Sequence, residues 1–148
     1  MIEPHTERDA SPARPPAIRE IPPIRVLVVE DDVEMRRLLT VTLERDGYDV
    51  VDVGSTREAK LEMLIAEHAG HDWVPRLIVT DRRMPDGDGL DLVAELRAHW
   101  WWMPVVVVTS FADGDVVRRA TALGCCRVLA KPVELEVVRR AVRDAVAR

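Results

Sequence analysis

The 148-residue sequence has only two cysteines, and no apolar run in it approaches the length of a bilayer. Cys125 and Cys126 are adjacent, so they offer neither a disulfide framework nor the spacing of a metal site. We expect them to be small core residues of a protein in the reducing cytoplasm. Because no segment has membrane-spanning length or the pattern of a signal peptide, we expect no association with a membrane.

An excess of positive charge is also missing. The formal net charge is −5, from 26 acidic and 21 basic residues. Binding to nucleic acid without sequence preference requires clustered cations, so the charge argues against a direct nucleic-acid partner. Nineteen of the basic residues are arginines, and the lysines are Lys60 and Lys131.

The length and the hydrophobic content of 47% are those of one domain with a full core. Residues 1–23 differ from the rest, because they hold six prolines among mixed charges and show little apolar periodicity. Such a segment cannot bury enough apolar surface to offset the entropy of ordering it. We predict a disordered, proline-rich tail over residues 1–23, with an expression remnant or a partner-binding peptide as alternatives, and one folded domain over residues 24–148.

Within the folded part, short apolar runs alternate with segments of helical periodicity. The expected strands are 24–29, 48–53, 77–80, 105–108 and 126–130, with 48–53 at an edge of the sheet. The expected helices are 33–46, 56–69, 90–99, 116–123 and 133–148. This alternation predicts right-handed β-α-β crossovers, and therefore a doubly wound α/β fold with five parallel strands and helices on both faces.

The first two helices carry clear start signals. Asp32 precedes the first helix as a candidate cap, and Ser55 precedes the second, with Glu58 three residues later. For the second helix we expect a core-facing side made of apolar residues: Leu61, Met63, Leu64 and Ile65.

Polar side chains of distinct kinds follow four of the expected strands. They are two acids at Glu30 and Asp31, a third acid at Asp81, a hydroxyl at Thr109 and an ammonium at Lys131. The carboxyl ends of parallel strands meet at one edge of a sheet, where ligands bind in doubly wound folds. Three crowded carboxylates repel one another, and a hard divalent cation such as Mg²⁺ relieves this repulsion.

Asp81 is the candidate reactive residue because it ends a buried strand and precedes a loop with a proline and two glycines. A carboxylate held ionised beside Mg²⁺ can attack phosphorus and form an aspartyl phosphate. Mg²⁺ and Lys131 would then spread the charge on the transferring oxygens. A compact ammonium suits this position, whereas the planar, forked guanidinium of an arginine needs more space.

Four segments in order resemble the receiver domain of bacterial two-component response regulators, related to the chemotaxis regulator. They are Val26–Asp32, Asp81 with Met84–Gly89, Pro104–Thr109, and Lys131 with Pro132. The resemblance covers roughly residues 24–148 and implies a flavodoxin-like fold with strand order 2-1-3-4-5. It implies a signalling phosphoacceptor, which catalyses only its own phosphorylation and dephosphorylation.

The same resemblance implies roles for individual residues. Asp81 would be the phosphoacceptor, and Mg²⁺ would be held by carboxylates and one backbone carbonyl, those of Glu30, Asp31, Asp81 and Arg83. Thr109 would be the switch hydroxyl and Lys131 the counter-ion, with a cis bond before Pro132. A sensor histidine kinase or a phosphotransfer protein would donate the phosphoryl group. Phosphorylation would bias a two-state surface around the fourth helix and fifth strand toward a downstream protein target.

Some positions depart from the family pattern. Val128 stands where the family usually has an aromatic residue coupled to the switch hydroxyl. Arg82 and Arg83 directly follow Asp81, and the side chain of Arg83 could compete with Mg²⁺ or lie on the phosphoryl group. Phe111, two residues past Thr109, could shield the acyl phosphate from water, which predicts slow self-dephosphorylation.

Two alternative functions therefore stay open beside the phosphoacceptor. One is a receiver-like binding module that works without phosphoryl transfer, favoured by Val128 and the two arginines. The other is a phosphatase like the haloacid dehalogenases, which share an aspartyl nucleophile, a hydroxyl and a lysine. That class expects a second aspartate where this chain has Arg83.

Trp100, Trp101 and Trp102 form an unusual run, because three consecutive side chains cannot all face one core. At least one indole is expected to be exposed. The run either packs locally against the loop at Trp73 or forms a contact with a partner or a second copy of the chain.

Overall fold

The computed structural model describes residues 22–147. The predicted tail lies outside the described residues, apart from Pro22 and Pro23, which are exposed. Among residues 22–147, no helix is both long enough and apolar enough to cross a bilayer.

The structure has one five-stranded parallel sheet. Its strands are β1 (Arg25–Val29), β2 (Asp49–Val53), β3 (Leu77–Thr80), β6 (Val105–Thr109) and β7 (Arg127–Ala130). Their spatial order is β2-β1-β3-β6-β7, which is the predicted order 2-1-3-4-5 with β2 at an edge. The three central strands are nearly continuous runs of buried residues because helices cover both faces of the sheet.

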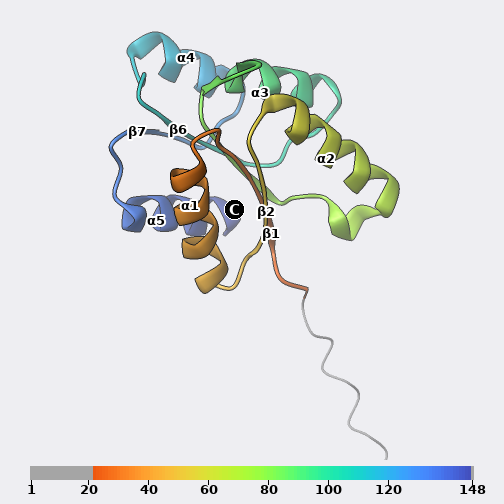
Figure 1. Ribbon diagram of the computed structural model, residues 1–148. Coiled ribbons are helices and arrows are strands. Elements are labelled where there is room, and N and C mark those ends of the chain that lie inside the picture. The colour runs from red at the N-terminus through yellow and green to blue at the C-terminus, as the bar shows by residue number, and fades with distance from the viewer. Residues whose placement is uncertain (1–21, 148) are drawn as a thin grey trace, which may run out of the picture.

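Five helices form the outer layers, as predicted. They are α1 (Val33–Arg45), α2 (Thr56–Ala69), α3 (Gly89–Ala98), α4 (Gly114–Ala122) and α5 (Leu135–Val146). α1 and α5 pack on one face of the sheet, while α2, α3 and α4 pack on the other (Figure 1). Successive strand residues such as Leu27 and Val28 belong to opposite core clusters, because side chains alternate between the faces of a strand.

The predicted caps start the first two helices. A carboxylate oxygen of Asp32 accepts a hydrogen bond from the backbone N–H of Met35 at 2.8 Å. The Ser55 hydroxyl accepts one from the N–H of Glu58 at 3.1 Å, and the Glu58 carboxylate accepts one from the N–H of Gly54 at 2.9 Å. These bonds satisfy N–H groups that have no partner within a helix.

The predicted inner face of α2 is wrong for three of its four residues. Leu61, Leu64 and Ile65 are about half exposed, and only Met63 is buried. The helix instead turns a stripe of mostly small residues inward: Thr56, Ala59, Met63 and Ala66. Small side chains at this spacing let the helix lie close to the sheet, so the large aliphatic residues remain on the outer side.

A short hairpin and a single helical turn were not predicted. The hairpin pairs β4 (Arg83–Met84) with β5 (Gly87–Asp88) in the segment expected to be a loop after Asp81. The 3₁₀ helix η1 (His71–Trp73) lies in the loop between α2 and β3. Elements of two or three residues are too short to carry a hydrophobic period, so the sequence pattern gives no sign of them.

Candidate functional site

The site lies at the carboxyl edge of the sheet, where backbone hydrogen bonds continue one residue past the strands. The N–H of Asp81 donates to Val29 O at 3.0 Å, and the N–H of Glu30 donates to Val53 O at 3.0 Å. The N–H of Lys131 donates to Thr109 O at 2.9 Å. The sheet therefore fixes the backbone of these residues and brings Glu30, Asp81, Thr109 and Lys131 to one edge.

Lys131 joins two of the carboxylates. Its Nζ donates to Asp81 Oδ2 at 2.7 Å and to Glu30 Oε1 at 2.8 Å. Burial alone would lower the pKa of Lys131, but its hydrogen bonds to Asp81 and Glu30 outweigh that effect and raise the pKa above its usual value. The ammonium therefore stays charged at neutral pH. The bond between Lys131 and Pro132 is cis.

Glu30 is the most buried acid of the site, with 2% of its surface exposed. Burial raises its pKa to about 7, and repulsion from Asp81 and Asp31 adds to the rise, while Lys131 opposes it. One ammonium is thus not enough to compensate the desolvation of this carboxylate.

Glu30, Asp31 and Asp81 each present a carboxylate oxygen, and the three oxygens lie within 4.8 Å of one another. Hard oxygen donors at this spacing suit Mg²⁺, which binds proteins through a few carboxylates and keeps several waters. Asp31 is exposed, so the cluster opens to solvent on that side. The three acids and their unrelieved repulsion fit such a cation.

The loop after β3 orients the Asp81 carboxylate. Its Oδ1 accepts hydrogen bonds from the N–H of Arg82 at 2.6 Å and of Arg83 at 3.4 Å. Gly89, the first residue of α3, lies against the same backbone: a Cβ added there would be 2.0 Å from Asp81 O. Only glycine permits this approach, so Gly89 helps to set the position of Asp81.

The two arginines after Asp81 do not form ion pairs with the acid cluster in the part of the chain that is described. Arg82 Nε lies 3.3 Å from Asp88 Oδ2. The guanidinium carbon of Arg83 lies 3.7 Å from the centre of the Phe111 ring. The side chain of Arg83 therefore makes a cation–π contact with Phe111 and does not compete for the acids. Its expected contact with a phosphoryl group stays a prediction.

Thr109 ends β6 and is fully buried. Its hydroxyl oxygen accepts a hydrogen bond from the N–H of Phe111 at 3.2 Å, and this bond stabilises the loop after β6. Val128 is partly buried and packs against the core cluster that includes Val116 and Ala120 of α4. The place of the usual aromatic residue is thus part of the apolar core under α4.

Sequence reasoning missed two residues that hold the site's surroundings together. The Asp86 carboxylate accepts hydrogen bonds from the N–H groups of Thr56 at 3.0 Å and Arg57 at 2.9 Å. The hydrogen bond from the N–H of Arg57 is the main cause that lowers the pKa of Asp86. The second residue is Arg36, whose Nη1 donates to Glu30 O at 3.0 Å. Asp86 lies about thirty residues from Thr56 and Arg57, so this contact leaves no local pattern in the sequence. Arg36 and Glu30 lie six residues apart, but Glu30 follows β1 and Arg36 belongs to α1, so they share no helical or strand period.

Comparisons with known proteins agree with this architecture. A family model described as response regulator receiver domain matches residues 26–143. The chain is 34% identical over 121 residues to the response regulator protein PilR of Pseudomonas aeruginosa, covering 82% of this chain and 26% of that protein. It is 30% identical over 148 residues to the transcriptional regulatory protein PdtaR of Mycobacterium tuberculosis, covering 100% of this chain and 64% of that protein. The non-phosphorylated HemR receiver domain from Leptospira biflexa superposes with a TM-score of 0.73 at 27% identity, covering 84% of this chain and 95% of that one.

Proposed function

The chain belongs to the family of response regulator receiver domains, and on this basis we propose that it accepts a phosphoryl group on Asp81 in two-component signalling. The observation that carries the proposal is the contact between Asp81 and Lys131 beside the acids Glu30 and Asp31. The Asp81 carboxylate, the Lys131 ammonium and two further acids that suit a cation meet at one edge of the sheet, which supports a role in phosphoryl transfer.

In the proposed transfer, one oxygen of Asp81 forms a bond to phosphorus as the donor's bond to phosphorus breaks. The leaving group, an imidazole of a phosphohistidine or an acetate of acetyl phosphate, departs with the bonding electrons. Mg²⁺, held by Glu30, Asp31, Asp81 and the backbone carbonyl of Arg83, would neutralise charge on the transferring oxygens. Lys131 holds the Asp81 carboxylate before transfer and would pair with a phosphoryl oxygen afterwards.

Thr109 is the proposed switch residue. Its hydroxyl would leave the N–H of Phe111 and donate to the new phosphoryl group, which pulls the loop before α4 toward the site. A changed surface around α4 and β7 would then select a downstream protein. In this proposal the chain is a signalling phosphoacceptor, and the protein target rather than DNA reads its state.

A hollow beside the site offers room for the phosphodonor. It has a volume of about 590 Å³ and lies between the start of α1 and the loop after β7. Lys131 and Glu30 line it together with apolar residues of both segments, and Leu38 on its rim is 52% exposed. A phosphohistidine of a sensor kinase or a phosphotransfer protein could reach Asp81 from this side.

One alternative is retained on a specific observation. Val128 fills the place of the coupling aromatic, and Thr109 is bonded to its own loop, which favours a binding module that works without phosphoryl transfer. The phosphatase alternative is not carried further, because the family is that of receiver domains.

The test is to incubate the protein with Mg²⁺ and acetyl phosphate and to record its intact mass. We expect the mass of one phosphoryl group to be added, and the addition to be lost with EDTA or in Asp81→Asn. Asp32→Asn is the matched control, because Asp32 is a neighbouring acid that caps α1 and does not belong to the cluster of Glu30, Asp31 and Asp81. An unmodified wild-type protein would favour the binding module. Intact mass is a better readout than tryptophan fluorescence. Trp73 and Trp100–Trp102 precede β3 and β6, so they lie at the opposite edge of the sheet from Asp81.

A further inference from the structure

Three exposed indoles lie at the amino ends of the strands, on the opposite edge from Asp81. Trp100 is 85% exposed, Trp102 is 63% exposed and Trp73 is 51% exposed. We call these three residues the tryptophan platform. Trp101, between two of them, is partly buried and packs against the core, so the run splits into one inward and two outward side chains. Exposed aromatic surface of this size is typical of a binding surface.

An arginine anchored by the backbone holds Trp102. Arg97 is 8% exposed, and its Nη1 donates to Trp101 O at 2.7 Å and to Met103 O at 2.8 Å. Its Nε donates to Leu123 O at 2.8 Å, at the carboxyl end of α4. The guanidinium carbon lies 5.1 Å from the centre of the Trp102 ring. Trp102 therefore has one cation–π contact, with a guanidinium whose position three hydrogen bonds to backbone carbonyls fix.

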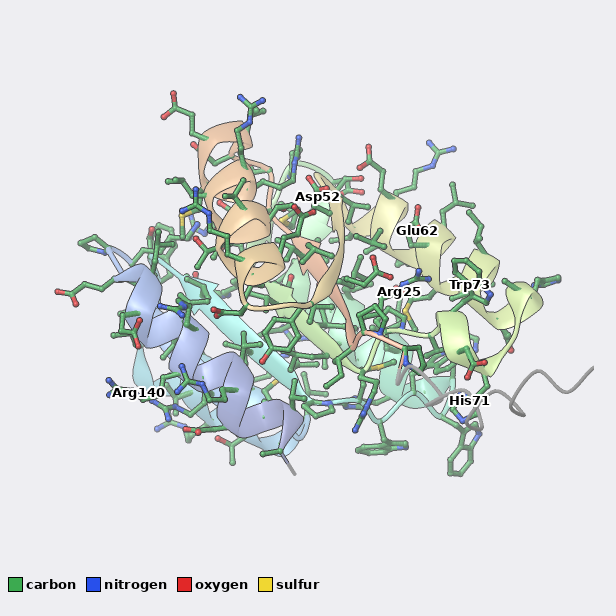
Figure 2. The ribbon with its side chains drawn as sticks, turned by 90° about the horizontal axis from the view of Figure 1, so that it is seen from below. Arg25, Asp52, Glu62, His71, Trp73 and Arg140 are labelled. Atoms are coloured by element: carbon green, nitrogen blue, oxygen red, sulfur yellow. The ribbon has the colours of Figure 1, made fainter. Side chains whose placement is uncertain are left out.

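A second arginine holds Trp73 in the same way. Arg25 donates from Nε and Nη2 to Asp49 Oδ2 at 2.9 and 2.7 Å, and from Nη1 to Trp73 O at 3.1 Å. Its guanidinium carbon lies 4.5 Å from the centre of the Trp73 ring, and the two side chains lie side by side in Figure 2. Each arginine covers part of an indole and leaves the rest to solvent. Aromatic side chains that are already ordered before a ligand arrives lose little conformational entropy when it binds.

Trp100 adds a strained backbone to this surface. Its φ of 67° lies in the left-handed region, which a bulky side chain rarely adopts. Trp100 follows α3, a position where glycine commonly takes this conformation. A large aromatic residue in this conformation, with 85% of its surface exposed, is consistent with a role of the indole in binding.

Of the platform, Trp102 borders a hollow of about 520 Å³. One wall comes from Trp101, Trp102 and the residues before β6, and another from Val74 and Pro75 before β3. Pro22 and Pro23, the first described residues, also line it. The described part of the chain therefore begins at this hollow.

We propose that the tryptophan platform binds the chain's own segment Pro12–Pro16, with the sequence Pro-Ala-Arg-Pro-Pro, as a polyproline II helix. Prolines spaced in this Pro-x-x-Pro pattern dock into grooves lined by aromatic residues, because the ordered form costs little entropy. The six residue steps from Pro16 to Pro22 span at most about 19 Å at the polyproline II rise. A tether this short gives the segment an effective concentration of about millimolar, so weak contacts suffice.

The test compares three full-length proteins: wild type, a variant with Pro12→Ala, Pro15→Ala and Pro16→Ala, and the control Pro4→Ala. Pro4 belongs to the same segment but lies outside the pattern. The readouts are acrylamide quenching of tryptophan fluorescence and the indole N–H signals in NMR spectra, assigned with single Trp→Phe variants. We expect the triple variant to be quenched about 1.5-fold more strongly than wild type, because stacked prolines no longer cover the indoles. The signals of Trp100 and Trp102 should shift, while Pro4→Ala resembles wild type.

Equal quenching and unchanged indole signals in the triple variant would overturn the proposal. A second copy of the chain is the competing occupant, and it predicts indole signals that depend on protein concentration. Recording the wild type at two concentrations separates the cases, because an intramolecular contact does not change on dilution. Concentration-dependent signals would therefore also overturn the proposal. None of these readouts depends on phosphorylation of Asp81.

Discussion

The guanidinium carbon of Arg83 lies 3.7 Å from the centre of the Phe111 ring, and this contact joins the loop after β3 to the loop after β6. Arg83 is two residues past Asp81, and Phe111 is two residues past Thr109. The stacked pair therefore bridges the two loops that carry the proposed phosphoacceptor and the proposed switch hydroxyl. An aromatic ring in this position can restrict the approach of water to an acyl phosphate.

Phe111→Ala is expected to shorten the lifetime of the phosphoryl group on Asp81 by about tenfold, the equivalent of about 1.4 kcal/mol in the hydrolysis barrier. The change removes the ring and frees Arg83, so water reaches the site more easily. The lifetime is measured as loss of phosphoryl mass after acetyl phosphate is removed. Val117→Ala is the control, because Val117 is a comparably exposed apolar residue on α4. An unchanged lifetime in Phe111→Ala would rule out shielding by the ring.

The fold could be predicted from the sequence because its central strands are continuous apolar runs, and such runs indicate strands that are covered on both faces. Val26–Val29 and Val105–Val108 are buried on both faces, and such runs favour a parallel sheet with two helical layers. The convergence of Glu30, Asp81 and Lys131 follows from the same topology, since parallel strands end at one edge. Lys131 was expected to act as the counter-ion of the phosphoryl group, and its direct hydrogen bonds to Glu30 and Asp81 are an additional finding of the structure.

Contacts between loops could not be predicted in the same way. Asp86 reaches Thr56 across thirty positions, and Arg83 stacks on Phe111 across twenty-eight. Neither pair leaves a period in the sequence. The inner face of α2 was also missed, because Leu61 and Leu64 dominate its hydrophobicity while Ala59 makes the close contact with the core.

Lys131→Ala is expected to slow phosphorylation by acetyl phosphate by about 100-fold, as removal of one well-placed charge from a transition state typically does. The ammonium lies 2.7 Å from Asp81 Oδ2 and 2.8 Å from Glu30 Oε1, and among residues 22–147 no other cation forms an ion pair with these two acids. Lys60→Ala is the matched control. Lys60 pairs with Glu95 at 2.7 Å on the surface, where its loss should leave the rate unchanged and alter stability by less than about 1 kcal/mol. Intact mass against time gives both rates, and equal rates would remove Lys131 from the transfer step.

Asp86→Ala is expected to lower the free energy of unfolding by about 1 kcal/mol, the usual effect of losing a helix cap. Its carboxylate satisfies the N–H groups of Thr56 and Arg57 at the start of α2. Asp86→Asn keeps one acceptor oxygen and should lose less. Urea unfolding at pH 7 measures the effect, with Asp144→Ala, an exposed acid of α5, as the control.

The effect of Asp86 should also depend on pH. Because these hydrogen bonds lower the pKa of Asp86 in the folded protein, its stabilisation is present above the unfolded value of about 3.9 and is lost as the pH falls below it. The difference in stability between wild type and Asp86→Ala should therefore shrink as the pH falls from 5 to about 3. A difference that stays constant over this range would show that the charge of Asp86 does not contribute.

Gly89 and Gly87 lie two residues apart and should respond differently to the same change. An alanine Cβ at Gly89 would lie 2.0 Å from Asp81 O and 3.0 Å from Thr80 Oγ1, so the backbone of Asp81 would have to shift. An alanine Cβ at Gly87 would meet only Thr56 Oγ1 at 3.6 Å, an ordinary van der Waals distance. We expect Gly89→Ala to lose about 1–3 kcal/mol of stability, the usual result of forcing an atom into a packed site.

The displacement in Gly89→Ala should also lower the yield of phosphoryl-Asp81 under conditions where the variant is folded. Gly87→Ala should stay within about 0.5 kcal/mol of wild type and keep full phosphorylation, because nothing near its Cβ needs to move. Urea unfolding and intact mass on the same samples give both quantities. If the two variants behave alike, the close approach of α3 to Asp81 does not determine the position of the phosphoacceptor.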